Sequence, residues 1–436
     1  MTFADFTSAQ SFYLWSIFGL SLFMGAVVNK TNFCTMGAVS DLVNMGDSGR
    51  LRAWLLAGTV ALLGVSLLEF LGAMDLSSPG TGQPGSLPPY RGVADAYAFP
   101  WGRFVLGGFL FGIGMTFGSG CGNKTLIRIG GGNIKSILVF ALIMVIAYYM
   151  VDPFKQLEAN WYQSYFQPWL DKASFDMNVS HDLGSMAASL FGSGMETTRL
   201  IVGLLVGGAL LFMIFRSSEF RSNFDNIFAG LVIGLVVIAA WYITSNMNLD
   251  IDGEQLDMRT FVTEQWDMVM DSDEGKPKNA GTNLLPTSYT FISPIGQVMG
   301  YAKSGFSISF LTFGVISVFG VILGSLLWSL ISKGFRIEWF ASWKDFFMHT
   351  IGGILMGFGG VLGMGCTVGQ GISGVSTLAL GSFLTLISII FGSALTMKIQ
   401  YYKLVYEDEA TFPRALITAL VDMKLLPSGM RQLEAV

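Results

Sequence analysis

Long runs of residues with almost no charged side chains recur along the whole chain, and they constrain its fold more than any other feature. About twenty apolar residues are needed for an α-helix to cross the hydrocarbon core of a bilayer. The chain has 436 residues, of which 52% are hydrophobic and 13% charged, and this is about half the charged share of a typical soluble domain. A large soluble core would need charges interleaved within these runs. The sequence therefore predicts an all-α polytopic membrane protein.

Nine of the apolar runs are long enough to be full membrane spans. We expect them at residues 12–28, 53–72, 103–119, 136–151, 200–215, 227–246, 307–331, 346–364 and 384–401. The first residues, MTFADFTSAQSF, contain no Lys or Arg, so they lack the basic region of a cleaved secretory signal. We therefore expect the first span to be retained.

The short loops after the first, third, fifth and seventh spans carry basic residues, among them Arg50, Lys124, Arg216 and Lys333. Short basic loops remain on the cytoplasmic side of a membrane. Since every odd-numbered span leads into such a loop, we expect the N-terminus outside and the C-terminus in the cytoplasm.

Long segments rich in acidic residues interrupt this pattern, and residues 73–102 form a Pro/Gly-rich loop that should be irregular. The expected organisation is a first half at 1–151, an acidic outer loop at 152–199, a connector at 200–226, a second half at 227–401 with a second acidic outer loop at 247–305, and a cytoplasmic tail at 402–436.

A glycine-rich stretch that ends in cysteine occurs twice. Gly107–Cys121 reads GGFLFGIGMTFGSGC and Gly352–Cys366 reads GGILMGFGGVLGMGC, with eight of the fifteen positions identical. The third span runs inward and the eighth outward, so the repeat is inverted, with spans 1–4 matching spans 6–9. Inverted repeats are typical of transporters. Close packing of membrane helices explains recurring glycines as well, but it does not explain why both stretches end in cysteine.

The chain has three cysteines, Cys34, Cys121 and Cys366, and each lies where an apolar segment gives way to small residues. A helix that breaks inside a bilayer must be buried in protein or line an aqueous path. We expect short re-entrant helices after Cys34 and Cys366, with their N-termini, which carry a partial positive charge, near the midplane. Such an N-terminus suits a small anion.

A thiol at this position is a weak donor and acceptor with a polarisable sulfur atom, which suits a sulfur-bearing anion. Three thiols in series would supply the successive weak partners that passage of a dehydrated anion requires. Neighbouring amides, at Asn32, Asn123 and Gln370, could either donate to the substrate or cap the broken helices. Lys124, Arg128 and Lys135 could attract an anion or simply be cytoplasmic charges.

The 23 methionines raise a different possibility, because thiol and thioether sulfur also bind Cu(I). Only Met36, Met115 and Met364 lie near a cysteine in the sequence, and there is no tight Met-x3-Met or Cys-x2-Cys arrangement. Packing of the core explains the scattered methionines better. We expect no metal or other cofactor.

The cysteine motifs resemble those of the YeeE/YedE family of bacterial inner-membrane sulfur-transport proteins. The resemblance rests on NFCTMGAVSD at Asn32–Asp41, GIGMTFGSGCGNKTLIRIGGGNIKSI at Gly112–Ile137 and GMGCTVGQGISG at Gly363–Gly374. It implies an inverted-repeat bundle in the inner membrane, thiosulfate uptake through cysteines placed like Cys34, Cys121 and Cys366, and a cytoplasmic sulfur-carrier protein as a possible partner. One branch of the family is linked to selenium instead. The second half lacks a cysteine equivalent to Cys34, and Thr290 is our candidate for that position.

The expected function is import of a small sulfur-containing anion, most simply thiosulfate, and not catalysis. No GxxxxGK[ST] loop occurs, so the chain is not expected to hydrolyse ATP, and no nucleic-acid partner is expected. A selenium-compound transporter, or a sulfurtransferase or redox protein that uses the cysteines covalently, is the alternative. A purely structural subunit would make the cysteines dispensable.

The orientation can be tested with a reporter that fluoresces only in the cytoplasm, fused after Val436. We expect fluorescence, because every odd-numbered span leads into a basic loop. A dark fusion at normal expression would overturn the orientation, together with the cytoplasmic placement of Lys124 and Arg128.

Overall fold

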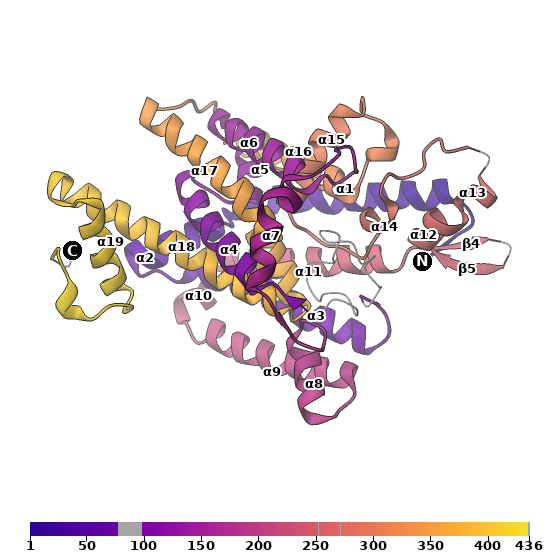
Figure 1. Ribbon diagram of the computed structural model, residues 1–436, viewed down its shortest axis with the longest axis horizontal. Coiled ribbons are helices and arrows are strands. Elements are labelled where there is room, and N and C mark those ends of the chain that lie inside the picture. Colours follow the sequence, from indigo (N-terminus) through magenta and orange to yellow (C-terminus); the bar gives the residue numbers. More distant parts are fainter. Residues whose placement is uncertain (77–97, 252, 271, 435–436) are drawn as a thin grey trace.

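The nine predicted spans are confirmed by a computed structural model, which describes residues 1–76, 98–251, 253–270 and 272–434 (Figure 1). Within these ranges nine helices are long and apolar enough to cross a membrane. They are α1 (Phe6–Thr31), α3 (Gly49–Phe70), α4 (Trp101–Phe117), α6 (Ile134–Val151), α9 (Met195–Phe215), α11 (Phe224–Ser245), α16 (Phe313–Ile331), α17 (Trp343–Leu362) and α18 (Leu380–Val405). The all-α membrane class is confirmed. Most of the loop expected at 73–102 lies outside the described residues.

Capping side chains decide where several of these helices begin. Helix α1 starts at Phe6, six residues before the expected boundary, because the Asp5 carboxylate accepts the backbone N–H of Ser8 at 2.8 Å. This bond satisfies an N–H group that has no partner within the helix. In α17 the Ser342 hydroxyl accepts the N–H of Asp345 at 3.2 Å in the same way. Apolar runs therefore indicate the spans, whereas polar caps determine their ends.

Four shorter elements lie between the spans: α2 (Thr35–Met45), α5 (Gly122–Gly130), α15 (Ile292–Lys303) and the π-helical segment η5 (Gly369–Gly374). Helices α2 and α5 and the helical segment that contains η5 each follow a cysteine. Helix α15 lies within the range expected as the second acidic loop, and it packs against α6 and α16. The re-entrant character of the segments stays a prediction.

The two acidic segments and the chain start form small folded structures outside the spans. The helical pieces are η1 (Tyr162–Phe166), α7 (Gln167–Leu170), η2 (Asp171–Ala173), α8 (Leu183–Phe191), α10 (Ser218–Ser222), α12 (Met258–Thr260), η3 (Phe261–Gln265), α13 (Trp266–Val269), α14 (Ala280–Asn283) and η4 (Ile308–Phe310). The strands are β1 (Thr2–Phe3), β2 (Ala98–Phe99), β3 (Phe175–Asp176), β4 (Asn248–Ile251) and β5 (Glu254–Asp257). Strand β4 pairs in parallel with β1 and antiparallel with β5, and β2 pairs antiparallel with β3.

The first acidic segment is joined by backbone hydrogen bonds to the turn between η5 and α18. The N–H of Leu183 donates to the carbonyl of Leu378 at 3.0 Å, and the N–H of Leu380 donates to the carbonyl of His181 at 2.9 Å. Together these bonds form an isolated antiparallel bridge. The turn between η5 and α18 is therefore hydrogen-bonded to a segment that lies outside the spans.

The C-terminal tail folds back on the end of α18. It contains η6 (Glu407–Glu409), α19 (Phe412–Asp422) and η7 (Ser428–Met430). The Asp422 carboxylate accepts the Tyr402 hydroxyl at 2.6 Å and is ion-paired with Arg431. The tail and the N-terminus lie at opposite ends of the molecule (Figure 1).

Helices α4 and α17 carry the glycine repeat, and they contact each other reciprocally. A Cβ atom added to Gly107 would lie 2.1 Å from the backbone nitrogen of Gly363, and one added to Gly352 would lie 2.4 Å from that of Gly118. Gly107 and Gly352 are equivalent positions of the repeat, as are Gly118 and Gly363. Such exchange of equivalent contacts is what a two-fold axis between the helices produces.

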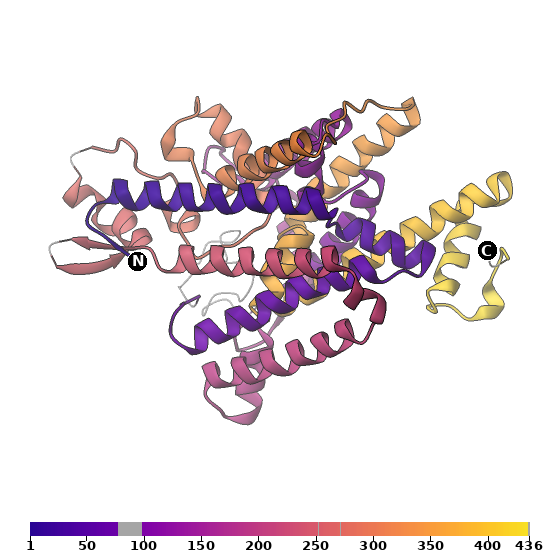
Figure 2. The ribbon, with the colours of Figure 1, turned by 180° about the vertical axis from the view of Figure 1, so that it is seen from behind.

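Two further pairs of helix–helix contacts are related in the same way. Helix α1 packs on α16 as α11 packs on α3, and α4 packs on α18 as α17 packs on α6. Helices α1 and α11 lie side by side (Figure 2). These four contacts therefore form two pairs that a two-fold axis would relate. The inverted repeat itself stays a prediction, which these contacts support.

Replacement of Gly112 or Gly357 by leucine should reduce the yield of folded protein. A Cβ at Gly112 would lie 2.3 Å from the carbonyl oxygen of Ile389, and one at Gly357 would lie 2.9 Å from the Cβ of Ile146. Overpacking of this kind costs about 1–3 kcal/mol or more. Gly208→Leu is the matched control, because nothing lies within 4 Å of a Cβ at that exposed site. Normal yield and unchanged thermal unfolding of both variants would contradict the packing role.

Candidate functional site

Each of the three cysteines stands directly before a helix. Cys34 is the N-cap of α2, and its Sγ accepts the N–H of Gly37 at 3.4 Å. Cys121 is the N-cap of α5. The Sγ of Cys366 accepts the N–H of Gly369 at 3.4 Å, in the helical segment that contains η5. Every thiol therefore lies at a helix N-terminus, where N–H groups without partners favour negative charge.

The fold brings these three helix starts together. A Cβ added to Gly122 would lie 3.8 Å from the Cβ of Cys366, so the second and third cysteine motifs touch. The first motif is joined to the second by the hydrogen bond from Lys124, three residues after Cys121, to Asn32, two residues before Cys34. All three cysteines are free and buried, with exposed fractions of 8% for Cys34, 3% for Cys121 and 0% for Cys366.

Thr290 lies beside Cys366, next to the start of α15. A Cβ added to Gly369 would lie 2.3 Å from the Thr290 Oγ1, so only glycine leaves room for the hydroxyl there. This oxygen is buried, and it makes no hydrogen bond to any described residue. Thr290 and α15 follow α11 as Cys34 and α2 follow α1. The proposed equivalence of Thr290 and Cys34 stays a prediction that this placement supports.

The polar residues near Cys34 and Cys121 bridge two elements. The Lys124 ammonium, on α5, donates to the Asn32 Oδ1 at 2.5 Å, and Asn32 is the C-cap of α1 with φ of 50°. Asn123 is buried, and its Oδ1 has no hydrogen-bond partner in the described structure. Lys124 and Asn32 therefore close the gap between α1 and α5, whereas Asn123 has capacity left for a ligand.

Gln370 holds the turn around Cys366 in place. Its Nε2 donates to the carbonyl of Gly363 at 2.7 Å, and its Oε1 accepts the Ser382 hydroxyl at 2.5 Å. The side chain thus ties the end of α17 to the start of α18 across the cysteine. Of the two uses expected for this amide, helix capping is the one for which the hydrogen bonds are present.

Two basic residues near the predicted inner mouth are also engaged. Arg128 donates to the carbonyl of Ser119 at 2.8 Å, and Lys135 is ion-paired with Asp345 at 2.8 Å. The first bond joins α5 to the turn before it, and the second joins α6 to α17. A structural role therefore accounts for both side chains.

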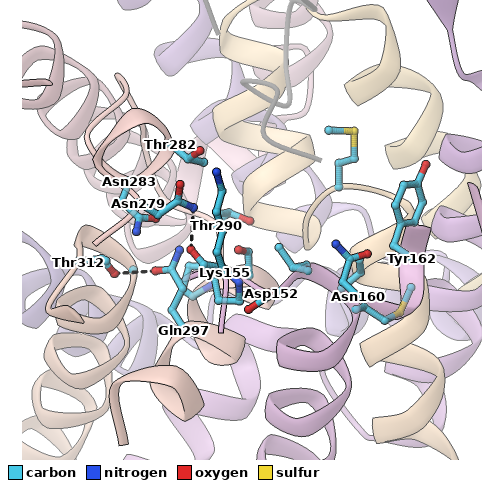
Figure 3. A pocket seen from close by; sticks show the side chains of 18 of the residues that line it. Asp152, Lys155, Asn160, Tyr162, Asn279, Thr282, Asn283, Thr290, Gln297 and Thr312 are labelled. Atoms are coloured by element: carbon cyan, nitrogen blue, oxygen red, sulfur yellow. Dashed lines mark hydrogen bonds between the residues drawn. The ribbon is translucent and has the colours of Figure 1, made fainter. Parts of the chain in front are cut away.

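A cavity of about 500 Å³ leads toward the cysteines from the side of the long acidic segments (Figure 3). Its walls come from residues 152–163 and 279–287, from the starts of α15 and α16, and from residues 360–365. Gln297 on α15 accepts the Thr312 hydroxyl at 2.6 Å in this wall. The cavity reaches Thr290 and Gly365, the residue next to Cys366. Both long segments therefore help to build the approach to the site.

Arg103 is a part of this cavity that the sequence reasoning missed. It is buried, donates to the carbonyls of Leu362 at 3.0 Å and Val361 at 3.3 Å, and lies 4.5 Å from the ring centre of Tyr162. Burial raises the pKa of the Tyr162 hydroxyl, while the neighbouring Arg103 opposes that shift. The guanidinium thus caps the carbonyl end of α17 and brings positive charge to the cavity. Only its position at the head of an apolar span could have indicated this role.

Sequence reasoning also missed Thr367 and an ion pair near Cys34. Thr367 is fully buried beside the Cys121 thiol, and its hydroxyl makes no hydrogen bond to a described residue. Asp41 on α2 is buried and ion-paired with Arg50, which neutralises an acidic residue close to the first thiol. In the sequence, the CTMG and CTVG motifs indicated a role for their cysteines but not for the threonine that follows each one.

Comparisons with known proteins identify the family of the chain. Residues 30–395 match the family model described as "Sulphur transport". The chain is 22% identical over 392 residues to the thiosulfate transporter TsuA of Escherichia coli (strain K12), an alignment that covers 85% of this chain and 89% of the relative. It is 20% identical over 386 residues to the thiosulfate transporter TsuA of Spirochaeta thermophila, with coverage of 87% and 97%. A bundle of nine apolar helices and a family match over most of its length lead to one assignment: the chain belongs to the YeeE/YedE family of sulfur-transport membrane proteins.

Proposed function

We propose that this protein imports thiosulfate across the bacterial inner membrane, with its N-terminus outside and its C-terminus in the cytoplasm. The observation that carries the proposal is the placement of three free, buried thiols at helix N-termini, with Cys366 directly after Gly365 of the cavity wall. The name thiosulfate transporter, which both relatives bear, supports the choice of substrate.

The anion would reach the site through the cavity between the two long segments. Its wall carries both signs of charge, with Arg103 and the exposed Lys155 as basic groups and Asp152 and Glu158 as acidic ones, and the two cations are the groups that would bind an anion. Figure 3 shows the Lys155 side chain between Asn283 and Asn160, so the approach is lined by amides as well as by charge. Amides and an ammonium replace part of the anion's hydration before it meets the thiols.

The thiols would then act in the order Cys366, Cys121 and Cys34. The cavity reaches Gly365 and Thr290, and Cys366 touches Gly122, the residue after Cys121. Next to Cys34, Lys124 on α5 donates to Asn32 at the end of α1. Weak contacts in series hold the anion without trapping it, as conduction requires.

Helix N-termini make this series favourable for an anion. At Cys34 and Cys366 the first-turn N–H groups already point at the sulfur, at 3.4 Å. An anion that takes the place of the thiol as acceptor gains those donors without any rearrangement of the helix. A cytoplasmic sulfur-carrier protein would receive the cargo at the inner face.

The contact between the Cys121 and Cys366 motifs also supports a second candidate, in which the cysteines carry sulfur covalently. A thiolate would attack the outer sulfur of thiosulfate, form a persulfide and release sulfite, and the next thiolate would then take the outer sulfur and release the first thiolate. Transport of a selenium compound is the third candidate, because selenium oxyanions and thiosulfate share charge and size. Only experiment separates these candidates from the relay of hydrogen bonds.

Cys121→Ser and Cys366→Ser should weaken uptake of labelled thiosulfate by membrane vesicles, and the alanine variants should weaken it further. Serine keeps a donor and an acceptor but lacks the polarisable sulfur, whereas alanine removes a contact worth about 1 kcal/mol, or roughly twice that to a charged group. Met115→Leu is the control, since it removes a buried sulfur atom from α4 without changing a thiol.

Membrane levels of every variant are measured alongside uptake, and the recovered wild-type protein is examined by mass spectrometry. Graded loss without added sulfur on any cysteine supports the relay. Equal loss for serine and alanine, together with a persulfide mass, would favour the covalent carrier. Uptake of selenite or selenosulfate in preference to thiosulfate would favour the selenium transporter.

A further inference from the structure

Several polar groups around Cys121 and Cys366 are buried without a hydrogen-bond partner in the described structure. They are the hydroxyl oxygens of Thr290 and Thr367 and the Oδ1 of Asn123. Buried polar atoms almost always find a partner in folded proteins, so each exception calls for an explanation. Three such exceptions around one pair of thiols indicate a site that is completed by a ligand.

The hydroxyls and thiols are paired across the two motifs. The Thr367 side chain follows Cys366 in sequence but lies beside the Cys121 thiol. The Thr290 side chain, from the start of α15, lies beside the Cys366 thiol and also lines the cavity. Each soft sulfur atom therefore has a hard hydroxyl donor next to it. Apart from its contact with the thiol, neither hydroxyl has a hydrogen-bond partner among the described residues.

We propose that Thr290, Thr367 and Asn123 form the oxygen-binding half of a two-ended site for a sulfur-bearing oxyanion. The hydroxyls donate to the oxygen atoms of the anion, while the thiols of Cys121 and Cys366 contact its terminal sulfur. Rotation of the Asn123 amide by half a turn presents its NH2 group to the same oxygen atoms. This inference rests on the proposed function and names the residues that select the substrate.

Such a site discriminates by chemistry rather than by size. Sulfate has oxygen atoms for the hydroxyls but no soft sulfur for the thiols, and sulfide has sulfur but no oxygen. An anion that carries both ends satisfies all the donors at once. A buried donor left without a partner disfavours the analogue that lacks the matching group, which is the strongest form of selectivity available to a polar site.

The test replaces each threonine by valine, which keeps the branched shape and removes the hydroxyl. In proteoliposomes, Thr367→Val and Thr290→Val should each raise the KM for labelled thiosulfate roughly tenfold, because each removes a hydrogen bond to a charged ligand. Serine at either position should restore KM to within about twofold, because the donor returns. Thermal unfolding in detergent should stay unchanged in all four variants.

Thr385→Val is the matched control. Its hydroxyl is also buried and without a partner in the described structure, but the residue belongs to α18, where it packs against Gly108 and Gly363. We expect a wild-type KM for this variant. An equal rise in KM for Thr385→Val would overturn the proposal, since the effect would then come from packing alone.

Inhibition by unlabelled sulfate separates the two ends of the site. Thr367→Val should weaken the inhibition by sulfate as well as the uptake of thiosulfate, whereas Cys366→Ser should weaken only the latter. A wild-type KM in both valine variants would overturn the two-ended site while leaving thiosulfate transport intact. Failure of the wild-type protein to take up thiosulfate would instead overturn the proposed function.

Discussion

Inside a bilayer, every backbone N–H and C=O group needs a partner within the protein, and the rest of this structure depends on that constraint. A continuous helix satisfies it automatically, but the chain breaks its helices at all three cysteines. The breaks are tolerated because side chains take up the freed groups. Arg103 accounts for two carbonyls at the end of α17, and Gln370 joins that end to α18. The site therefore exists only where the surrounding protein completes the hydrogen bonding.

Glycine makes that completion possible by letting backbones meet. At Gly107 and Gly352 the neighbouring main chain lies so close that a side chain has no room. Helices α4 and α17 pack antiparallel, so the end of each lies beside the other's first half, and the turns that follow them bring Gly122 and Cys366 together. The glycine repeat and the cysteine motifs therefore act together. The glycines position the thiols, and the thiols and nearby hydroxyls supply the contacts.

The sequence predicted the spans well because apolar length is a local property. The family followed from motifs that are also local, and both were confirmed. Helix ends were less accurate, as the Asp5 cap of α1 shows. Tertiary contacts were out of reach: the place of Arg103 and Thr367 follows from neighbours more than two hundred residues away. Helix α15 was hidden in an acidic stretch, since its 12 residues are too few for a span.

The backbone bridge between residues 181–183 and 378–380 gives the acidic segment a mechanical meaning. A main-chain bridge of this kind transmits displacement, because neither strand can shift along its axis without breaking both bonds. The turn between η5 and α18 is therefore coupled through its main chain to the folded segment before α9. A ligand that displaces the acidic segment would therefore pull on the start of α18, the helix that follows the segment after Cys366.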